Sequence, residues 1–153
     1  MTQKKHPPII TGVLGLAVDS QRRFLLTQRH QPKDPEVHEK WQLPGGGMEF
    51  GETPEQTLAR EMQEELGVSV RILSPYPLVK THVWNTKRET YHVTLICYLV
   101  SIDSQTPTLH DVETKDWRWV TLNEAAELDS LPLTYDFVVE GEKHSQEVLV
   151  RTT

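Results

Sequence analysis

The sequence predicts a single α/β domain, and three observations support this. The chain has 153 residues, which is enough for one domain with a sizeable core. Strand-like apolar segments are interspersed with helical patterns, an order typical of mixed α/β structures. One helix is marked by capping residues at both ends. We therefore expect one domain over residues 9–153, preceded by a loose polar tail at residues 1–8.

The domain is expected to begin with two strands. The apolar segment from Ile9 to Val18 is typical of a buried strand, and a polar turn follows it at residues 19–22. A second strand at Phe24–Arg29 would complete a hairpin. Residues 30–40 contain two prolines and many charged side chains, so we expect a loop there.

The best-defined helix is predicted over residues 54–66. Thr53 is a good N-cap residue, and Gln56 three positions later can complete a capping box. Pro54 occupies the first helical position, where its missing N–H costs nothing. Gly67 suits a left-handed C-cap, so both ends of the helix are defined by the sequence.

Further strands are expected after this helix. Strand segments are predicted at Val68–Leu73 and Leu78–Val83, with a turn at Asn85–Arg88. The strongest strand pattern spans Tyr91–Ile102, because this segment is rich in β-branched and aromatic residues. A polar connection at residues 103–116 then leads to the last strand.

That last strand is predicted at Trp117–Val120, and helices are expected beyond it. Asn123 is interpreted as the N-cap of a short helix at roughly residues 124–128. Residues 134–146 are expected to form another helix or an irregular tail, because Gly141 lowers the helix propensity.

The two faces of the helix at residues 54–66 differ in chemistry. Apolar residues recur at every fourth position on one face: Leu58, Met62 and Leu66. Three carboxylates gather on another side at i, i+3 and i+4 spacing: Glu61, Glu64 and Glu65. These like charges repel, so either water screens them or a cation binds them. Hard divalent cations such as Mg²⁺ or Mn²⁺ prefer oxygen ligands, whereas the alternative is a solvated acidic face.

The spacing around this helix carries a family resemblance. Gly46 is followed after five residues by Glu52, and after seven more by the segment REMQEELGV at residues 60–68. This arrangement fits every fixed position of the pattern G-x5-E-x7-R-E-U-x-E-E-x-G-U, where U is apolar. The chain resembles the Nudix hydrolases, most of all the MutT-type nucleoside triphosphate pyrophosphohydrolases. The resemblance implies an α/β/α sandwich around a mixed sheet, with a loop–helix–loop as the catalytic element.

The resemblance also implies roles for the acidic residues. Glu61 and Glu65 would be ligands of Mg²⁺ or Mn²⁺, and Glu64 would be a ligand or a base. The carbonyl of Gly46 can add another oxygen. Which carboxylate acts as the base varies within the family, so that assignment stays open.

Glu52 and Arg60 are interpreted as the structural members of the catalytic element. In the family this glutamate often pairs with the arginine of the box and orients the carboxylates. Arg60 also lies four residues before Glu64, a spacing that permits a helical ion pair.

Two substrate contacts are expected outside the box. Some Nudix nucleotide hydrolases carry a phosphate-binding arginine near the position of Arg29, and guanidinium pairs well with phosphate. The alternatives are an exposed arginine at a strand end, or Gln28 in the same place. Several Nudix enzymes draw a further carboxylate from the connection that here contains Asp111 and Glu113. Glu113 is slightly preferred as a metal ligand or a base, and a solvated loop acid is the alternative.

The resemblance implies hydrolysis of a nucleoside diphosphate linked to another group. The first hypothesis is a nucleoside triphosphate pyrophosphohydrolase that releases pyrophosphate and a nucleoside monophosphate. ADP-ribose and nucleotide sugars are the alternative substrates, and a non-catalytic ligand-sensing module is a less favoured hypothesis because all box residues are kept. His82 and Trp84 could line a base pocket or pack in the core. Cys97 lies mid-strand, which disfavours an isopentenyl-diphosphate isomerase activity that relies on a cysteine.

Charge and hydropathy limit the partners. The net charge of −6 argues against binding a nucleic-acid polymer, although a bound metal would allow a nucleotide to bind. No apolar run approaches the roughly 20 residues that cross a bilayer, and no signal-peptide pattern follows the N-terminal lysines. We therefore expect a cytoplasmic protein without membrane contact. The prediction leaves a homodimer open.

Overall fold

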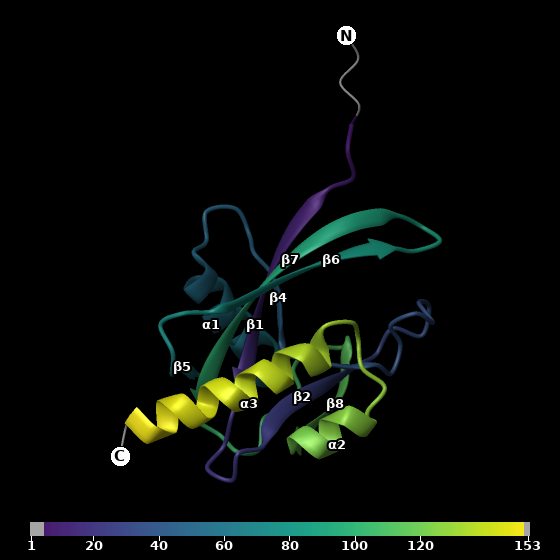
Figure 1. Ribbon diagram of the computed structural model, residues 1–153. Helices are drawn as coiled ribbons and strands as arrows, with labels where there is room; N and C mark the ends of the chain where they lie inside the picture. Colours follow the sequence, from purple (N-terminus) through teal and green to yellow (C-terminus); the bar gives the residue numbers. More distant parts are fainter. Residues whose placement is uncertain (1–4, 152–153) are drawn as a thin grey trace.

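The computed structural model describes residues 5–151, and its strands form two sheets (Figure 1). The larger sheet comprises β1 (Ile9–Ala17), β4 (Gly45–Gly47), β5 (Val70–Ile72), β6 (Leu78–Asn85) and β7 (Thr90–Ile102). Its strand order is β4-β1-β7-β5, with β6 also paired to β7. The smaller sheet comprises β3 (Trp41–Gln42), β2 (Phe24–Arg29) and β8 (Thr114–Val120), in that order.

Helices cover both sides of the sheets. Figure 1 shows α3 (Thr134–Arg151) on the near side, with the short α2 (Leu122–Glu127) below it, and α1 (Pro54–Leu66) on the far side. One core cluster includes side chains of α2 and α3: Leu16, Phe24, Cys97, Ala125 and Phe137. The other includes the apolar stripe of α1: Val13, Leu25, Leu58, Met62 and Leu66. The predicted α/β/α sandwich is confirmed, and Cys97 is a buried core residue.

The centre of the larger sheet determines where the box lies. β1 runs parallel to β7 along its whole length, and β4 pairs antiparallel with β1. This pairing sets Gly46 beside Val13 at the edge of the sheet, directly before the loop that leads into α1. β6 and β7 continue beyond the body as a hairpin (Figure 1).

The helix of the box agrees with its prediction residue for residue. Thr53 accepts a hydrogen bond from the Gln56 N–H, and the Gln56 side chain accepts one from the Thr53 N–H, which completes the capping box. Gly67 adopts the left-handed conformation with φ of +63°. The strand prediction at residues 24–29 is also confirmed, and the predicted strand at 91–102 begins one residue earlier, at Thr90.

The predicted hairpin between the first two strands is wrong. β1 and β2 belong to different sheets and meet only at an isolated bridge between Val18 and Phe24. Both strands are largely buried, so each takes its partners from distant segments, and the turn at residues 19–22 passes the chain from one sheet to the other. Local turn chemistry cannot distinguish these two outcomes.

Two C-terminal predictions also change. Thr121, not Asn123, is the N-cap of α2, because its hydroxyl accepts the Glu124 N–H while the Glu124 side chain caps Thr121 in return. α3 is a continuous helix through Gly141. A Cβ at Gly141 would lie 2.0 Å from a methyl carbon of Leu16, so only glycine allows the helix to pack this closely on β1.

The described residues also bear on the expected tail and on membrane contact. Residues 1–4 of the tail lie outside the described residues, and residues 5–8 are exposed and precede β1. Among the described residues, no helix is both long and apolar enough to span a membrane.

Candidate active site

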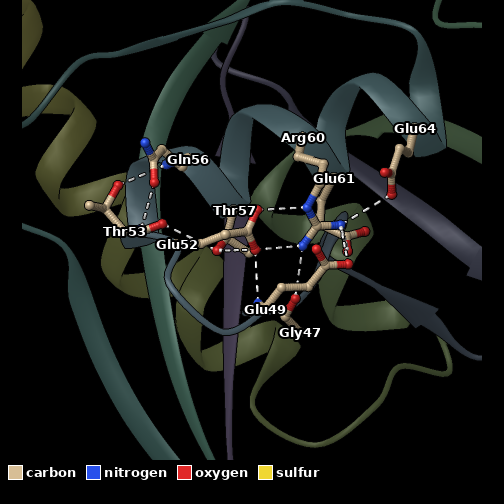
Figure 2. A network of polar contacts seen from close by, with 9 residues as sticks. All are labelled: Gly47, Glu49, Glu52, Thr53, Gln56, Thr57, Arg60, Glu61 and Glu64. Carbon is tan, nitrogen blue, oxygen red and sulfur yellow. Dashed lines mark hydrogen bonds and ion pairs between the residues drawn. The ribbon is translucent and has the colours of Figure 1, made fainter.

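Arg60 is the cation around which the carboxylates of the box gather (Figure 2). Its Nε donates to Glu52 Oε2 at 2.8 Å and its Nη2 to Glu52 Oε1 at 2.9 Å. Its Nη1 donates to Glu61 at 2.9 Å and to Glu64 at 3.2 Å. Nη2 also donates to the Gly47 carbonyl, at 3.1 Å, which ties α1 to β4. The predicted pairing of Arg60 with Glu52 and with Glu64 is present.

Glu52 holds the loop before α1 in place. It accepts the Glu49 N–H at 2.8 Å and the Thr57 hydroxyl at 3.1 Å (Figure 2). Hydrogen bonds, the strongest from Arg60, lower the pKa of Glu52 to about 2. Glu52 is therefore a permanent anion that fixes both the loop and the guanidinium.

Glu61 lies directly over the backbone of β4. A Cβ at Gly46 would lie 2.5 Å from the carboxyl carbon of Glu61, a distance that no real contact allows. The absence of a side chain at Gly46 is thus what lets the carboxylate approach the strand. Burial raises the pKa of Glu61, and its ion pair with Arg60 partly offsets this effect.

Glu65 is the buried carboxylate of the site, with only 4% of its surface exposed. It accepts the Gly45 N–H at 3.1 Å and the Thr114 hydroxyl at 3.3 Å. Burial raises its pKa to about 7, although these hydrogen bonds favour the charged form. A carboxyl group that titrates near neutral pH can take up or release a proton, or can bind a cation that restores its charge.

An acidic cavity of about 240 Å³ joins these groups to the connection before β8. Four carboxylates line it: Glu61, Glu65, Asp111 and Glu113. The loop that carries the last two is anchored to the end of α1, because the His110 N–H donates to the Glu65 carbonyl at 3.1 Å. His110 also packs over Gly67, where a Cβ would lie 2.6 Å from the ring. The C-terminal glycine of the box thus leaves room for the loop that supplies Asp111 and Glu113.

A second cavity, of about 280 Å³, opens beside the acidic one and shares Arg29, Gln42 and residues 45–47 with it. Its wall includes three aromatic side chains of the β6–β7 hairpin: His82, Trp84 and Tyr91. Trp84 stacks on Tyr91, with ring centroids 6.2 Å apart. We refer to the two spaces as the acidic cavity and the aromatic cavity.

Arg29 lies where the two cavities meet. Its Nη2 donates to Gln31 at 2.7 Å and its Nη1 to Gln42 at 3.3 Å. Its Nε is buried and has no hydrogen-bond partner within residues 5–151. An unpaired buried donor at the junction of two cavities is suited to an anionic ligand. Gln28, the alternative to Arg29, instead donates to the Glu39 carbonyl and lines neither cavity.

The donor set around the acidic cavity suits a hard cation, because all four of its charged side chains are carboxylates. Within residues 5–151, no three acidic, histidine or cysteine side chains already converge as a metal centre. Arg60 accounts for this, since it holds both Glu61 and Glu64. A metal ion would therefore have to take carboxylate oxygens from the guanidinium.

The structure separates the predicted glutamates. Glu61 and Glu65 line the acidic cavity together with Glu113, but the Glu64 side chain is 60% exposed and lies outside its lining. His82 and Trp84 line the aromatic cavity, as one of the two sequence interpretations expected.

Sequence reasoning missed four residues of the site: Asp34, Gln42, Tyr91 and Thr114. Only Tyr91 had a usable signal, because it lies opposite Trp84 across the predicted turn and so shares its face. The others occupy loops or strand ends without a motif.

Comparison with known proteins agrees with this geometry. Residues 8–139 match the family model described as NUDIX domain. Nucleoside triphosphatase NudI of Enterobacter sp. (strain 638) is 37% identical over 97 residues, covering 59% of this chain and 67% of that protein. The 8-oxo-dGTP diphosphatase of Proteus vulgaris is 40% identical over 70 residues, covering 46% of this chain and 58% of that protein. The chain thus matches between about half and two thirds of the length of these relatives.

A solved structure shows the same fold. The MutT NUDIX hydrolase from Burkholderia pseudomallei superposes with a TM-score of 0.71 at 24% sequence identity. The match covers 85% of this chain and 95% of that one. At this identity the similarity speaks for the architecture of the two chains.

Proposed function

The chain belongs to the Nudix hydrolase family, and on that premise we propose that it hydrolyses nucleoside triphosphates to nucleoside monophosphates and pyrophosphate. The observation that carries this proposal is the pair of adjoining cavities with Arg29 between them. The acidic cavity has the chemistry to hold a metal-bound polyphosphate, and the aromatic cavity has the chemistry to hold a base. The names of the two relatives, a nucleoside triphosphatase and an 8-oxo-dGTP diphosphatase, support the same reaction class.

Nudix hydrolases generally need a divalent metal ion, and we propose Mg²⁺ or Mn²⁺ for this chain. Glu61 and Glu65 would hold it, with the Gly46 carbonyl as a further oxygen ligand. Glu64 is a ligand or a base in this proposal, and either role requires that Arg60 releases it. A bound divalent cation would neutralise phosphate charge and lower the pKa of a bound water.

The chain's own residues have distinct parts in the proposed reaction. Glu65 can exchange a proton near neutral pH, because its burial raises its pKa to about 7. Arg60 and Glu52 orient the carboxylates rather than touch the substrate. Arg29 would bind phosphate through its unpaired Nε.

Glu113 and Asp111 are proposed as additional ligands or bases at the far side of the acidic cavity. Both line the cavity, and the hydrogen bonds of their loop to the end of α1 and to the start of β2–β3 support a fixed position: His110 N–H to Glu65, and His30 N–H to Glu113. The same arrangement does not favour one acid over the other.

We further propose a cytoplasmic enzyme of one domain over residues 9–153 that acts on small nucleotides. The net charge of −6 supports a small substrate rather than a nucleic-acid polymer. No membrane contact is proposed, and a homodimer stays a prediction from the sequence.

A screen for Mg²⁺-dependent hydrolysis tests the proposal. Nucleoside triphosphates, oxidised dGTP, ADP-ribose and nucleotide sugars are incubated with the protein, and products are followed by ³¹P NMR. Pyrophosphate with a nucleoside monophosphate supports the proposal. Two monophosphates from ADP-ribose or a nucleotide sugar, with triphosphates intact, would replace it by the alternative substrate class. Binding without turnover of any compound would replace it by a ligand sensor.

A further inference from the structure

Asp34 is the one acidic side chain that lines the aromatic cavity within residues 5–151. It lies on the loop between β2 and β3, and its Oδ1 accepts the Glu36 N–H at 3.2 Å. Its carbonyl accepts the N–H groups of Val37 and His38, so the turn that carries it is fixed from both ends. Within the described part of the chain, nothing donates to Oδ2. The carboxylate is therefore held in place with an acceptor oxygen unused.

The aromatic hairpin lines the same cavity. Trp84 and Tyr91 stack with an interplanar angle of 18°, and His82 meets Trp84 edge-on with centroids 5.2 Å apart. Burial raises the pKa of Tyr91, and the charges of Glu89, Arg29 and Asp34 act on it to a smaller extent. Asp34 is thus close enough to the hairpin to share one flat ligand with it. Base–aromatic stacking provides affinity with little base preference.

The remaining polar side chains of the cavity leave acceptor chemistry to Asp34. The amide oxygens of Gln31 and Gln42 are both taken by Arg29, so these residues offer N–H donors to a ligand. An ionised carboxylate is acceptor-only, and its two oxygens can take two parallel N–H donors. The cavity therefore presents a single two-point acceptor.

Guanine is the base whose pairing edge fits such an acceptor. Its N1–H and N2 amino groups are adjacent donors, whereas adenine and cytosine present one donor beside an acceptor nitrogen. We propose that Asp34 selects guanine nucleotides by accepting hydrogen bonds from N1–H and the N2 amino group. This specificity rests on the proposed function, because it assigns the base to the cavity that adjoins the phosphate site. Inosine lacks only the N2 amino group and so isolates one of the two hydrogen bonds.

The experiment compares dGTP, dITP and dATP as substrates of the wild type and of Asp34→Asn. The variant keeps a side-chain oxygen for the Glu36 N–H but replaces the free acceptor with an N–H₂ donor. We expect the wild type to favour dGTP over dITP by about tenfold in kcat/KM, the size of one hydrogen bond to a charged group. In Asp34→Asn this ratio should fall to about one, mainly through KM. Glu36→Gln, a change to an exposed acid of the same loop, should leave the ratio unchanged.

Binding measurements separate this proposal from the proposed function. Calorimetry with the α,β-methylene analogues of the three triphosphates reports base preference without turnover, and thermal melting checks that Asp34→Asn is folded. A guanine preference in binding that Asp34→Asn abolishes supports the role of Asp34 even if no triphosphate is hydrolysed. An equal dGTP to dITP ratio in the wild type would overturn it, and so would an unchanged preference in a folded Asp34→Asn. Either of these outcomes, with triphosphate hydrolysis intact, leaves the proposed function standing.

Discussion

Arg60 and Glu52 form a two-point ion pair, with N–O distances of 2.8 and 2.9 Å, between a helix and the loop that precedes it. The same guanidinium holds Glu61 and Glu64 through its other nitrogen. Glu52 thus keeps Arg60 in place while a bound cation competes for the other two carboxylates. This division of labour explains why the box needs an acid outside the helix.

Glu52→Gln should lower the melting temperature, and the size of the effect should depend on pH. The pKa of Glu52 is about 2 in the folded protein against an ordinary 4.5, so the folded state binds fewer protons between these values. The contribution is fully present above about pH 4.5 and is lost as the pH falls towards 2. Melting curves of both proteins, with Glu127→Gln as an exposed control, measure it. A difference that stays constant from pH 7 down to pH 2.5 contradicts this assignment.

Gly46→Ala should reduce kcat/KM by about 10²-fold while leaving the melting temperature nearly unchanged. The new methyl group would occupy the position of the Glu61 carboxylate, which can swing away at small cost in stability but then leaves the cavity. Gly47→Ala is the matched control, because a Cβ at Gly47 meets no atom within 4 Å. Equal activities of the two variants would show that the position of Glu61 does not matter.

The burial of Glu65 should make the metal-free protein less stable as the pH rises. Its pKa is about 7 when folded against an ordinary 4.5, so the folded state binds more protons between these values. Stability is therefore lost over this window, by on the order of 3 kcal/mol. Chemical unfolding with a chelator present should show Glu65→Gln gaining on the wild type from pH 4.5 to 7. A pH-independent difference would mean that Glu65 is not destabilised when charged.

Arg29→Ala should raise KM for a triphosphate by about tenfold, with a smaller effect on kcat, because a charged hydrogen bond to phosphate is lost. Arg71→Ala removes an exposed arginine of β5 and serves as the control. Steady-state kinetics with dGTP measures both. If KM is unchanged in Arg29→Ala, the buried Nε has no role in substrate binding.

The sequence predicted the parts of the molecule that local chemistry determines. The ends of α1 follow from Thr53 and Gly67, which cap it, and the spacing of the glutamates follows from the helix. What it could not provide is pairing between distant segments. The predicted hairpin of β1 with β2 failed because β1 pairs with β7, some 80 residues later in the chain.

The same limit applies to the candidate site. Helical spacing places Glu61, Glu64 and Glu65 on related faces, but it does not say which one is buried. Glu65 is enclosed because β4 and Thr114 pack against it, whereas Glu64 remains exposed beside Arg60. Asp34 enters the aromatic cavity only because its loop folds back towards the β6–β7 hairpin.

The central claim is that the carboxylates of the acidic cavity carry out pyrophosphate release. The most direct test is the Mg²⁺-dependent kcat of Glu61→Gln and Glu65→Gln with a nucleoside triphosphate, with pyrophosphate followed by ³¹P NMR and Glu127→Gln as the control. We predict a loss of about 10²-fold or more in each cavity variant, the size expected when an acid–base or metal-binding group is removed, and near-wild-type turnover in the control. Near-wild-type turnover of both cavity variants would contradict the account.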